Sequence, residues 1–254
     1  FNFNESLLIN SEIPPIKFAW WHHKINWLQY DWIVGLLNKS EFTEKNRFLI
    51  YHRYSINKNN LRIGFTEAVL STYEEWGARE IEYLLPSNVL LETEANSGFN
   101  TNLIWLIDFM YKVNSYTLYA EMMIDDFAID GKTPAQIAGT VGFGKKYNKF
   151  LINIEYTRIN RWVGNHCDQA NIFIDNDVPI GNSLGPNAHR LLIDNKLFLN
   201  DKLSINNLFY YVEHGNGNPY DRLIELWPEG ISCDENFGYG YDSSFLKDKK
   251  NNYY

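Results

Sequence analysis

The chain of 254 residues has a net charge of −8 and no basic cluster, which excludes nucleic-acid binding and a polybasic lipid-binding surface, because both need grouped Lys and Arg. No apolar run approaches the roughly 18 to 20 residues of a membrane-spanning helix, which excludes a helical membrane protein. Aromatic residues make up 16% of the chain and Asn is abundant, a composition that favours strands and turns, while Cys167 and Cys233 are too few for a disulfide framework.

The N-terminus, FNFNESLLIN, lacks an initiator Met and the features of a signal peptide, and we interpret it as a processed or truncated start. Beyond it, apolar and polar residues alternate with a period of two, which predicts strands that have one apolar and one polar face. In chain order, the predicted strands cover Asn26–Leu37, Arg47–Ile56, Leu61–Leu70, Asn102–Val113, Thr117–Phe127, Gln136–Gly144, Leu151–Thr157, Arg190–Asn200 and Leu203–Glu213.

Most of these strands are joined by short turn signals, such as NKNN after Ile56 and GKKYNK before Phe150. Strands joined this tightly must be antiparallel neighbours, so the predicted fold class is all-β, an antiparallel up-and-down meander. Two connections are much longer, residues 71–99 and 160–188, and loops of such length in a compact domain are usually functional.

Strand length favours a transmembrane β-barrel over a soluble sandwich. The clearest segments, such as Asn102–Val113, reach the roughly 9 to 11 residues that a tilted strand needs to cross a bilayer. Their apolar faces carry rings such as Trp105 and Phe109, as expected of a lipid-facing surface. A soluble barrel whose apolar side faces inward has the same pattern, so the direction of Leu118, Met122 and Ile124 separates the two folds.

Five motifs occur in an order that resembles the Wzi family of capsule assembly proteins. They are FLIYHRYSINKNNLRIGFTEAVLS, YLLPSNVLLETEANSGFNTNLIWLIDF, LYAEMMIDDF, PAQIAGTVGFGKKYNKFLINIEYTRINRW and IGNSLGPNAHRLLI. The resemblance spans roughly residues 45 to 215. The chain departs from the family pattern at Ala120, where we expect Gly, and at Ala188 and His189, where we expect an Asp after GPN.

The resemblance implies an antiparallel barrel in the bacterial cell outer membrane that is sealed rather than porin-like. It also implies binding of capsular or surface polysaccharide without catalysis, with outer-membrane lipid as the second partner and no cofactor. The predicted strands are fewer than those of the family barrel. We therefore interpret residues 1–254 as a single β-barrel domain, part of a longer barrel and so incomplete by itself.

Charged residues on the polar faces form the candidate site. Opposite charges inside a barrel satisfy one another, so we expect a network that plugs the lumen more than one that binds a ligand. By its position in the alternation, Glu67 falls on the same face as the apolar Ile63 and Phe65. It can belong to the polar face only if a bulge shifts the alternation or if the strand ends before Glu67. The lumen or ligand candidates are Arg53, Glu67, Asp108, Glu121, Asp125, Glu155, Arg158 and Arg190.

We predict no catalytic residue and no metal site. Asp125 and Asp126 are consecutive, as are His22 and His23, so each pair points to opposite faces of a strand. Aromatic and Asn-rich loops are the better candidates for sugar recognition. They include the segment GNGNPY at residues 215–220, with Trp162, Tyr73, Trp76 and Tyr220 as the rings.

The sequence is compatible with three functions. The first is a membrane barrel that binds or organises polysaccharide, and the second is a soluble all-β enzyme acting on polysaccharide, with Glu121 and Asp108 as acid and base. The third is a small-molecule-binding β-barrel.

Overall fold

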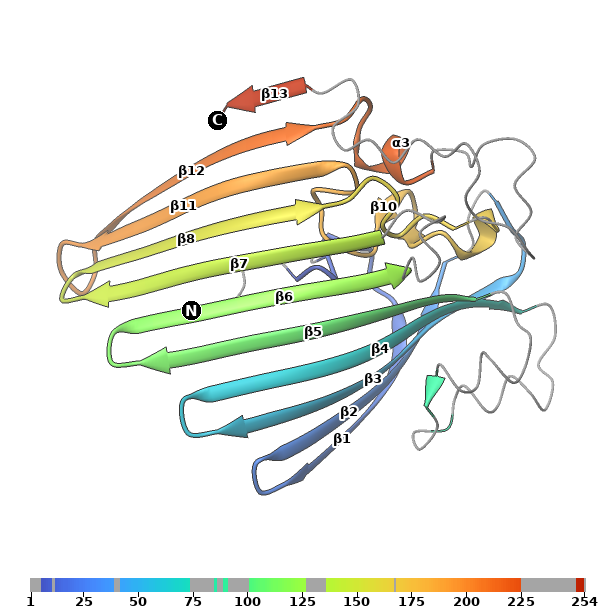
Figure 1. Ribbon diagram of the computed structural model, residues 1–254, viewed down its shortest axis with the longest axis horizontal. Coiled ribbons are helices and arrows are strands. Elements are labelled where there is room, and N and C mark those ends of the chain that lie inside the picture. The colour runs from blue at the N-terminus through green and yellow to red at the C-terminus, as the bar shows by residue number, and fades with distance from the viewer. Residues whose placement is uncertain are drawn as a thin grey trace.

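The computed structural model describes residues 6–10, 12–38, 42–73, 85, 89–90, 101–126, 136–166, 168–224 and 250–253. One antiparallel sheet of eleven strands dominates it, in the order β1-β2-β3-β4-β5-β6-β7-β8-β11-β12-β13 (Figure 1). The strands are β1 Lys17–Ile25, β2 Leu28–Leu37, β3 Asn46–Lys58, β4 Leu61–Tyr73, β5 Asn102–Val113, β6 Tyr116–Asp126, β7 Gln136–Tyr147, β8 Phe150–Ile159, β11 Ala188–Phe198, β12 Ser204–His214 and β13 Lys250–Tyr253.

Each strand pairs with the next one along the sheet, so the predicted up-and-down meander is confirmed. In the part of the chain that the structure describes, the sheet is curved but not closed, with β1 at one edge and β13 at the other (Figure 1). Strand β1 was not predicted, because its sequence KFAWWHHKI places two Trp and two His side by side and breaks the alternation. Among the described residues, no helix is long and apolar enough to cross a membrane.

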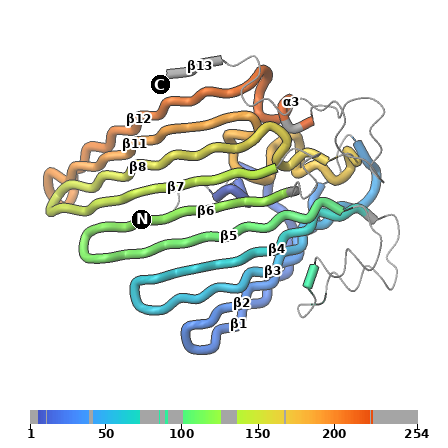
Figure 2. The backbone as a smooth tube through the Cα atoms, in the orientation of Figure 1, coloured from blue at the N-terminus to red at the C-terminus, as the bar shows by residue number. Residues whose placement is uncertain are grey.

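Asn residues build the hairpin turns at one end of the sheet. Four two-residue turns each begin with an Asn in the left-handed region, which Asn tolerates better than most residues. These are Asn26, Asn59, Asn114 and Asn148, with φ of 55°, 54°, 51° and 47°. Figure 2 shows these short turns at one end of the strands and the long connections at the other. We call these the turn end and the loop end.

The two faces of the sheet differ in chemistry. On β6, Leu118 and Met122 are 47% and 42% exposed, whereas Tyr119 and Glu121 on the opposite face are buried. We call the face that carries Tyr119 and Glu121 the inner face and the other the outer face. The outer face exposes an apolar band that includes Phe109, Val141 and Ile154, each more than a third exposed. The apolar side therefore faces outward, which contradicts a soluble barrel with an apolar interior.

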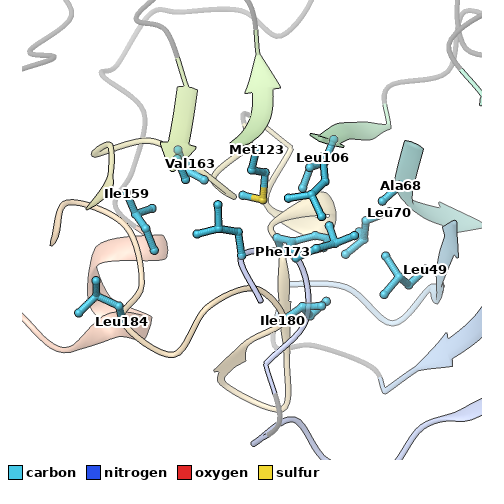
Figure 3. Packing of buried hydrophobic residues seen from close by; sticks show 14 of the residues in the cluster. Leu49, Ala68, Leu70, Leu106, Met123, Ile159, Val163, Phe173, Ile180 and Leu184 are labelled. Atoms are coloured by element: carbon cyan, nitrogen blue, oxygen red, sulfur yellow. The ribbon is translucent and has the colours of Figure 1, made fainter. Parts of the chain in front are cut away.

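An apolar core fills the loop end of the inner face. It includes Leu49, Leu70, Leu106 and Met123 from the strands, and residues from the 160–187 connection. Figure 3 shows Phe173, Ile180 and Leu184 of that connection directed toward the strand residues. The connection contains the 3-10 helix η1 (Gln169–Asn171) and a small two-stranded sheet, β9 (Ile174–Asp175) with β10 (Val178–Pro179). We call residues 160–187, with residues 6–10 packed beside them, the plug.

Candidate functional site

A charge pair spans the inner face between β3 and β5. Arg53 lies 2.6 Å from Asp108 through Nη1 and donates to its second oxygen through Nη2 at 2.9 Å. Arg62 lies 3.6 Å from the same carboxylate. The pair crosses Gly64 on the intervening strand β4, where a Cβ atom would overlap both side chains. Glycine at this position is therefore what allows a two-point Arg–carboxylate contact across two strands.

A second network lies between β6, β8 and β11. The Tyr119 hydroxyl donates to Glu155 at 2.8 Å and accepts from the Asn153 amide at 2.9 Å. Arg190 lies 3.5 Å from the other oxygen of Glu155. Gly142 on β7 leaves the space that the Tyr119 ring occupies. Together with the first pair, this network places paired polar groups on the inner face from the turn end toward the plug.

Two further carboxylates hold the plug. Glu121 accepts a hydrogen bond from the backbone N–H of Leu7 at 2.8 Å, which fixes residues 6–10 against the inner face. Asp125 lies in a bulge of β6, and its carboxylate accepts from the backbone N–H of Gly164 at 2.5 Å. Asp108 and Glu121 are register partners, but each already has a protein partner, which does not favour an acid–base pair.

Glu67 and Arg158 lie on the outer face, apart from the other six candidates. Glu67 keeps the parity of Ile63 and Phe65, because β4 pairs with β3 and β5 without a bulge. Its carboxylate is buried and accepts from the backbone N–H of Leu90 at 3.4 Å. Arg158 is exposed and pairs in register with His189. These two residues are therefore not on the inner face, and their grouping with the lumen candidates is wrong.

Two buried arginines that the sequence did not point to hold the plug at both ends. Arg47 is fully buried and donates to the carbonyl oxygens of Ala170, Ile172 and Ile174 at 3.1, 2.8 and 2.8 Å. No sequence signal marks Arg47, because its partners lie more than 120 residues away.

Arg222 belongs to the short helix α3 (Pro219–Leu223). It donates to the carbonyl oxygens of Leu184, Pro186 and Gly217 at 2.5, 2.7 and 2.8 Å. Burial lowers the pKa of its guanidinium to about 10, so it remains a cation at neutral pH. Both arginines thus satisfy backbone carbonyls that would otherwise be buried without donors.

The fold of the chain is similar to that of a solved structure. That structure is Wzi, an outer-membrane protein involved in group 1 capsule assembly in Escherichia coli and a carbohydrate-binding β-barrel. The TM-score is 0.59, the identity is 13%, and the match covers 84% of this chain. The chain has a Wzi-like barrel fold.

The match covers 51% of Wzi, so this chain spans about half the length of its structural relative. The resemblance drawn from motif order is confirmed at the level of the fold. No family model and no curated protein matches the chain.

Two of the aromatic rings expected to recognise sugar, Trp162 and Tyr220, are instead packed against other residues of the protein. Trp162 is 4% exposed and stacks with the Arg161 guanidinium, 4.8 Å from the ring centroid. Tyr220 packs against the core residues Ile172 and Ile174. The structure does not describe Trp76 or Cys233. It describes the backbone of Tyr73 and Asp126 but not their side chains.

Among the described residues, no group of three or more His, Cys, Asp or Glu side chains is arranged to hold a metal ion. His22 contacts Asp31 at 2.8 Å on β2 rather than His23. Near the plug, the His166 ring accepts from the backbone N–H of Asp168 at 3.0 Å.

The inner face holds an open pocket at its loop end, beside the plug. It has a volume of about 390 Å³ and lies between β11, β12 and the segments around residues 184 and 218. Of the eight predicted candidates, only Arg190 lines it. Gly217, Asn218 and Pro219 also line it, and they belong to the Asn-rich loop expected to recognise sugar. The other lining residues were not predicted, because they come from separate parts of the chain.

Proposed function

We propose that this chain is part of an outer-membrane β-barrel that binds surface or capsular polysaccharide and does not transform it. One observation supports this most: the sheet exposes apolar side chains on its outer face and buries charged ones on its inner face. Water-soluble proteins bury apolar surface, whereas a barrel in lipid exposes it. Similarity to a carbohydrate-binding barrel of the same fold supports the ligand class.

The proposal places residues 1–254 in one domain of a longer barrel. All nine residues of β1 are exposed, and an edge strand in a bilayer would leave backbone groups without partners. Further strands beside β1 and β13 would satisfy them. The short turns would face the periplasm and the long connections the cell exterior, as in bacterial barrels of known topology.

The proposed interior is sealed rather than open. The charge networks and the plug occupy the inner face, so the barrel would present a binding surface at its loop end and not a wide channel. An enzyme acting on polysaccharide is the alternative, but Asp108 and Glu121 are already bound to Arg53 and Leu7.

Membrane insertion is tested first. The purified full-length protein, with the further strands that the proposal requires, should float with lipid vesicles in a density gradient and should migrate faster in gels before boiling than after it. Val141→Arg places a charge at an outer-face position that is 56% exposed, and should reduce stability in lipid by about 2 to 4 kcal/mol if the residue lies near the midplane.

Val141→Leu is the matched control and should insert normally, because it keeps the outer face apolar. A full-length protein that stays in buffer and shows no change in mobility on heating would exclude the membrane placement. Binding to purified polysaccharides is measured separately, on the detergent-solubilised chain.

A further inference from the structure

The pocket at the loop end of the inner face has the size and composition of a ligand site. Its volume of about 390 Å³ lies in the range of roughly 300 to 1,000 Å³ that small-molecule sites occupy. Its lining includes apolar side chains of β11 and β12, namely Leu192, Leu208 and Val212. Polar groups in the lining come from Arg190, Tyr210, His214, Asn218 and Arg222.

The charge of this pocket is opposite to that of the chain. The whole chain has a net charge of −8, with 31 acidic residues. Nevertheless, none of the described residues that line the pocket is Asp or Glu, whereas Arg190 and Arg222 both line it. A pocket with this wall attracts an anion and disfavours a cation.

The two arginines differ in how they are held. Arg222 is fixed by three carbonyl oxygens, which hold its positive charge in one position beside the pocket. The adjacent Asp221 is exposed, and its carboxylate accepts from the backbone N–H of Asn218. Arg222 therefore acts as a fixed charge behind the pocket.

Arg190 is the side chain suited to direct contact. Its distance of 3.5 Å to Glu155 exceeds the roughly 2.7 to 2.9 Å of a strong charge-assisted hydrogen bond. Glu155 also accepts the shorter bond from Tyr119, at 2.8 Å. A guanidinium binds a carboxylate through two parallel hydrogen bonds, which a neutral hydroxyl cannot reproduce.

We propose that this pocket binds a carboxylate-bearing sugar residue of the polysaccharide, with Arg190 at the carboxylate. Tyr210 provides a ring for the apolar face of the sugar, and Asn218 provides an amide for its hydroxyl groups. This inference rests on the proposed carbohydrate-binding function. It adds that the ligand is an anion, and it names the residues that recognise its charge.

The experiment compares two ligands that differ only in charge. Hyaluronan tetrasaccharide and the same tetrasaccharide with its carboxyl groups reduced to alcohols are titrated into the full chain in detergent by calorimetry. The native chain should bind the acidic form at least about tenfold more tightly. Arg190→Gln should remove that preference and leave the affinity for the reduced form unchanged.

Two controls address charge and folding. Arg158→Gln removes the same charge on the neighbouring strand, but from the outer face, and should keep the preference. Because Arg190→Gln leaves Glu155 without its cation, a second variant avoids the buried network. Leu208 lines the pocket and is 55% exposed, so Leu208→Glu should weaken binding of the acidic form at least tenfold relative to Leu208→Gln.

Equal affinity of the native chain for the two tetrasaccharides overturns this inference and leaves carbohydrate binding intact. A preference for the acidic form that survives both Arg190→Gln and Leu208→Glu overturns the assignment to this pocket. Binding of neither tetrasaccharide, nor of any polysaccharide tested, overturns the proposed function together with the inference.

Discussion

The two halves of the inner face are filled in different ways. The turn-end half contains paired charges, with Arg53 on Asp108 and Tyr119 on Glu155. The loop-end half contains an apolar core, and its buried Arg47 contacts backbone carbonyls. In the turn-end half, side chains of the strands contact one another directly. In the loop-end half, the plug lies against the strands and fills the space. An inserted segment has backbone groups to satisfy, and arginine supplies several donors at once.

The largest effect is expected from breaking the arginine contacts of the loop-end half. Arg47→Met would leave three buried carbonyl oxygens without their donor, at a cost of about 3 to 5 kcal/mol, comparable to breaking a buried ion pair. The loss should concentrate in the plug, so hydrogen exchange should accelerate in residues 168–187 more than in β6 to β8. Urea unfolding in lipid vesicles, followed by Trp fluorescence, measures the total.

Arg158→Met is the control for that experiment. It removes the same kind of side chain from an exposed position on the outer face, and should change stability by no more than about 0.5 kcal/mol. A uniform acceleration of exchange over the whole sheet in Arg47→Met would contradict a role confined to the plug.

A smaller loss is expected in the turn-end half. Asp108→Leu leaves the Arg53 guanidinium without its partner and should destabilise the chain by about 2 to 4 kcal/mol. The double variant Arg53→Met with Asp108→Leu should recover at least half of that loss, since replacing both partners removes the uncompensated charge. A double variant as unstable as the sum of the two single variants would show that the pair does not act as a unit.

The smallest of these effects tests the packing of the second network. Gly142→Ala places a methyl group against the Tyr119 ring and should cost about 1 to 3 kcal/mol. Gly139→Ala, on the same strand, meets only the Glu121 carbonyl oxygen at 3.8 Å and should be nearly neutral. Equal thermal stability of the two variants would mean that the ring moves aside without cost.

Strands β2 to β8, β11 and β12 and the six inner-face candidates were predictable, because each depends on the local alternation of side chains between the two faces. Asn102–Val113 was predicted with the observed bounds, and Asp108, Glu121 and Glu155 lie on one face as the alternation required. Arg158 was assigned to the wrong face although Ile154 and Tyr156 share its parity. The prediction grouped Arg158 with the other charged residues and did not apply the alternation of side chains along β8, which places it on the outer face.

The plug contacts were not predictable from the residues. Arg47 has partners that lie far along the chain, and the pocket draws on β11, β12 and two loops. Local periodicity carries no information about which distant segment enters a curved sheet. The same holds for Leu90, which covers Glu67 on the outer face.

By itself, the sequence determined that the chain is a meander of long antiparallel strands with one apolar and one polar face, because side-chain direction alternates along any strand. Which face is inside was decided by tertiary structure. An alternating pattern is the same whether the sheet curves one way or the other, and only the position of the plug, with Phe173 and Leu7 against the polar-lined face, distinguishes the two.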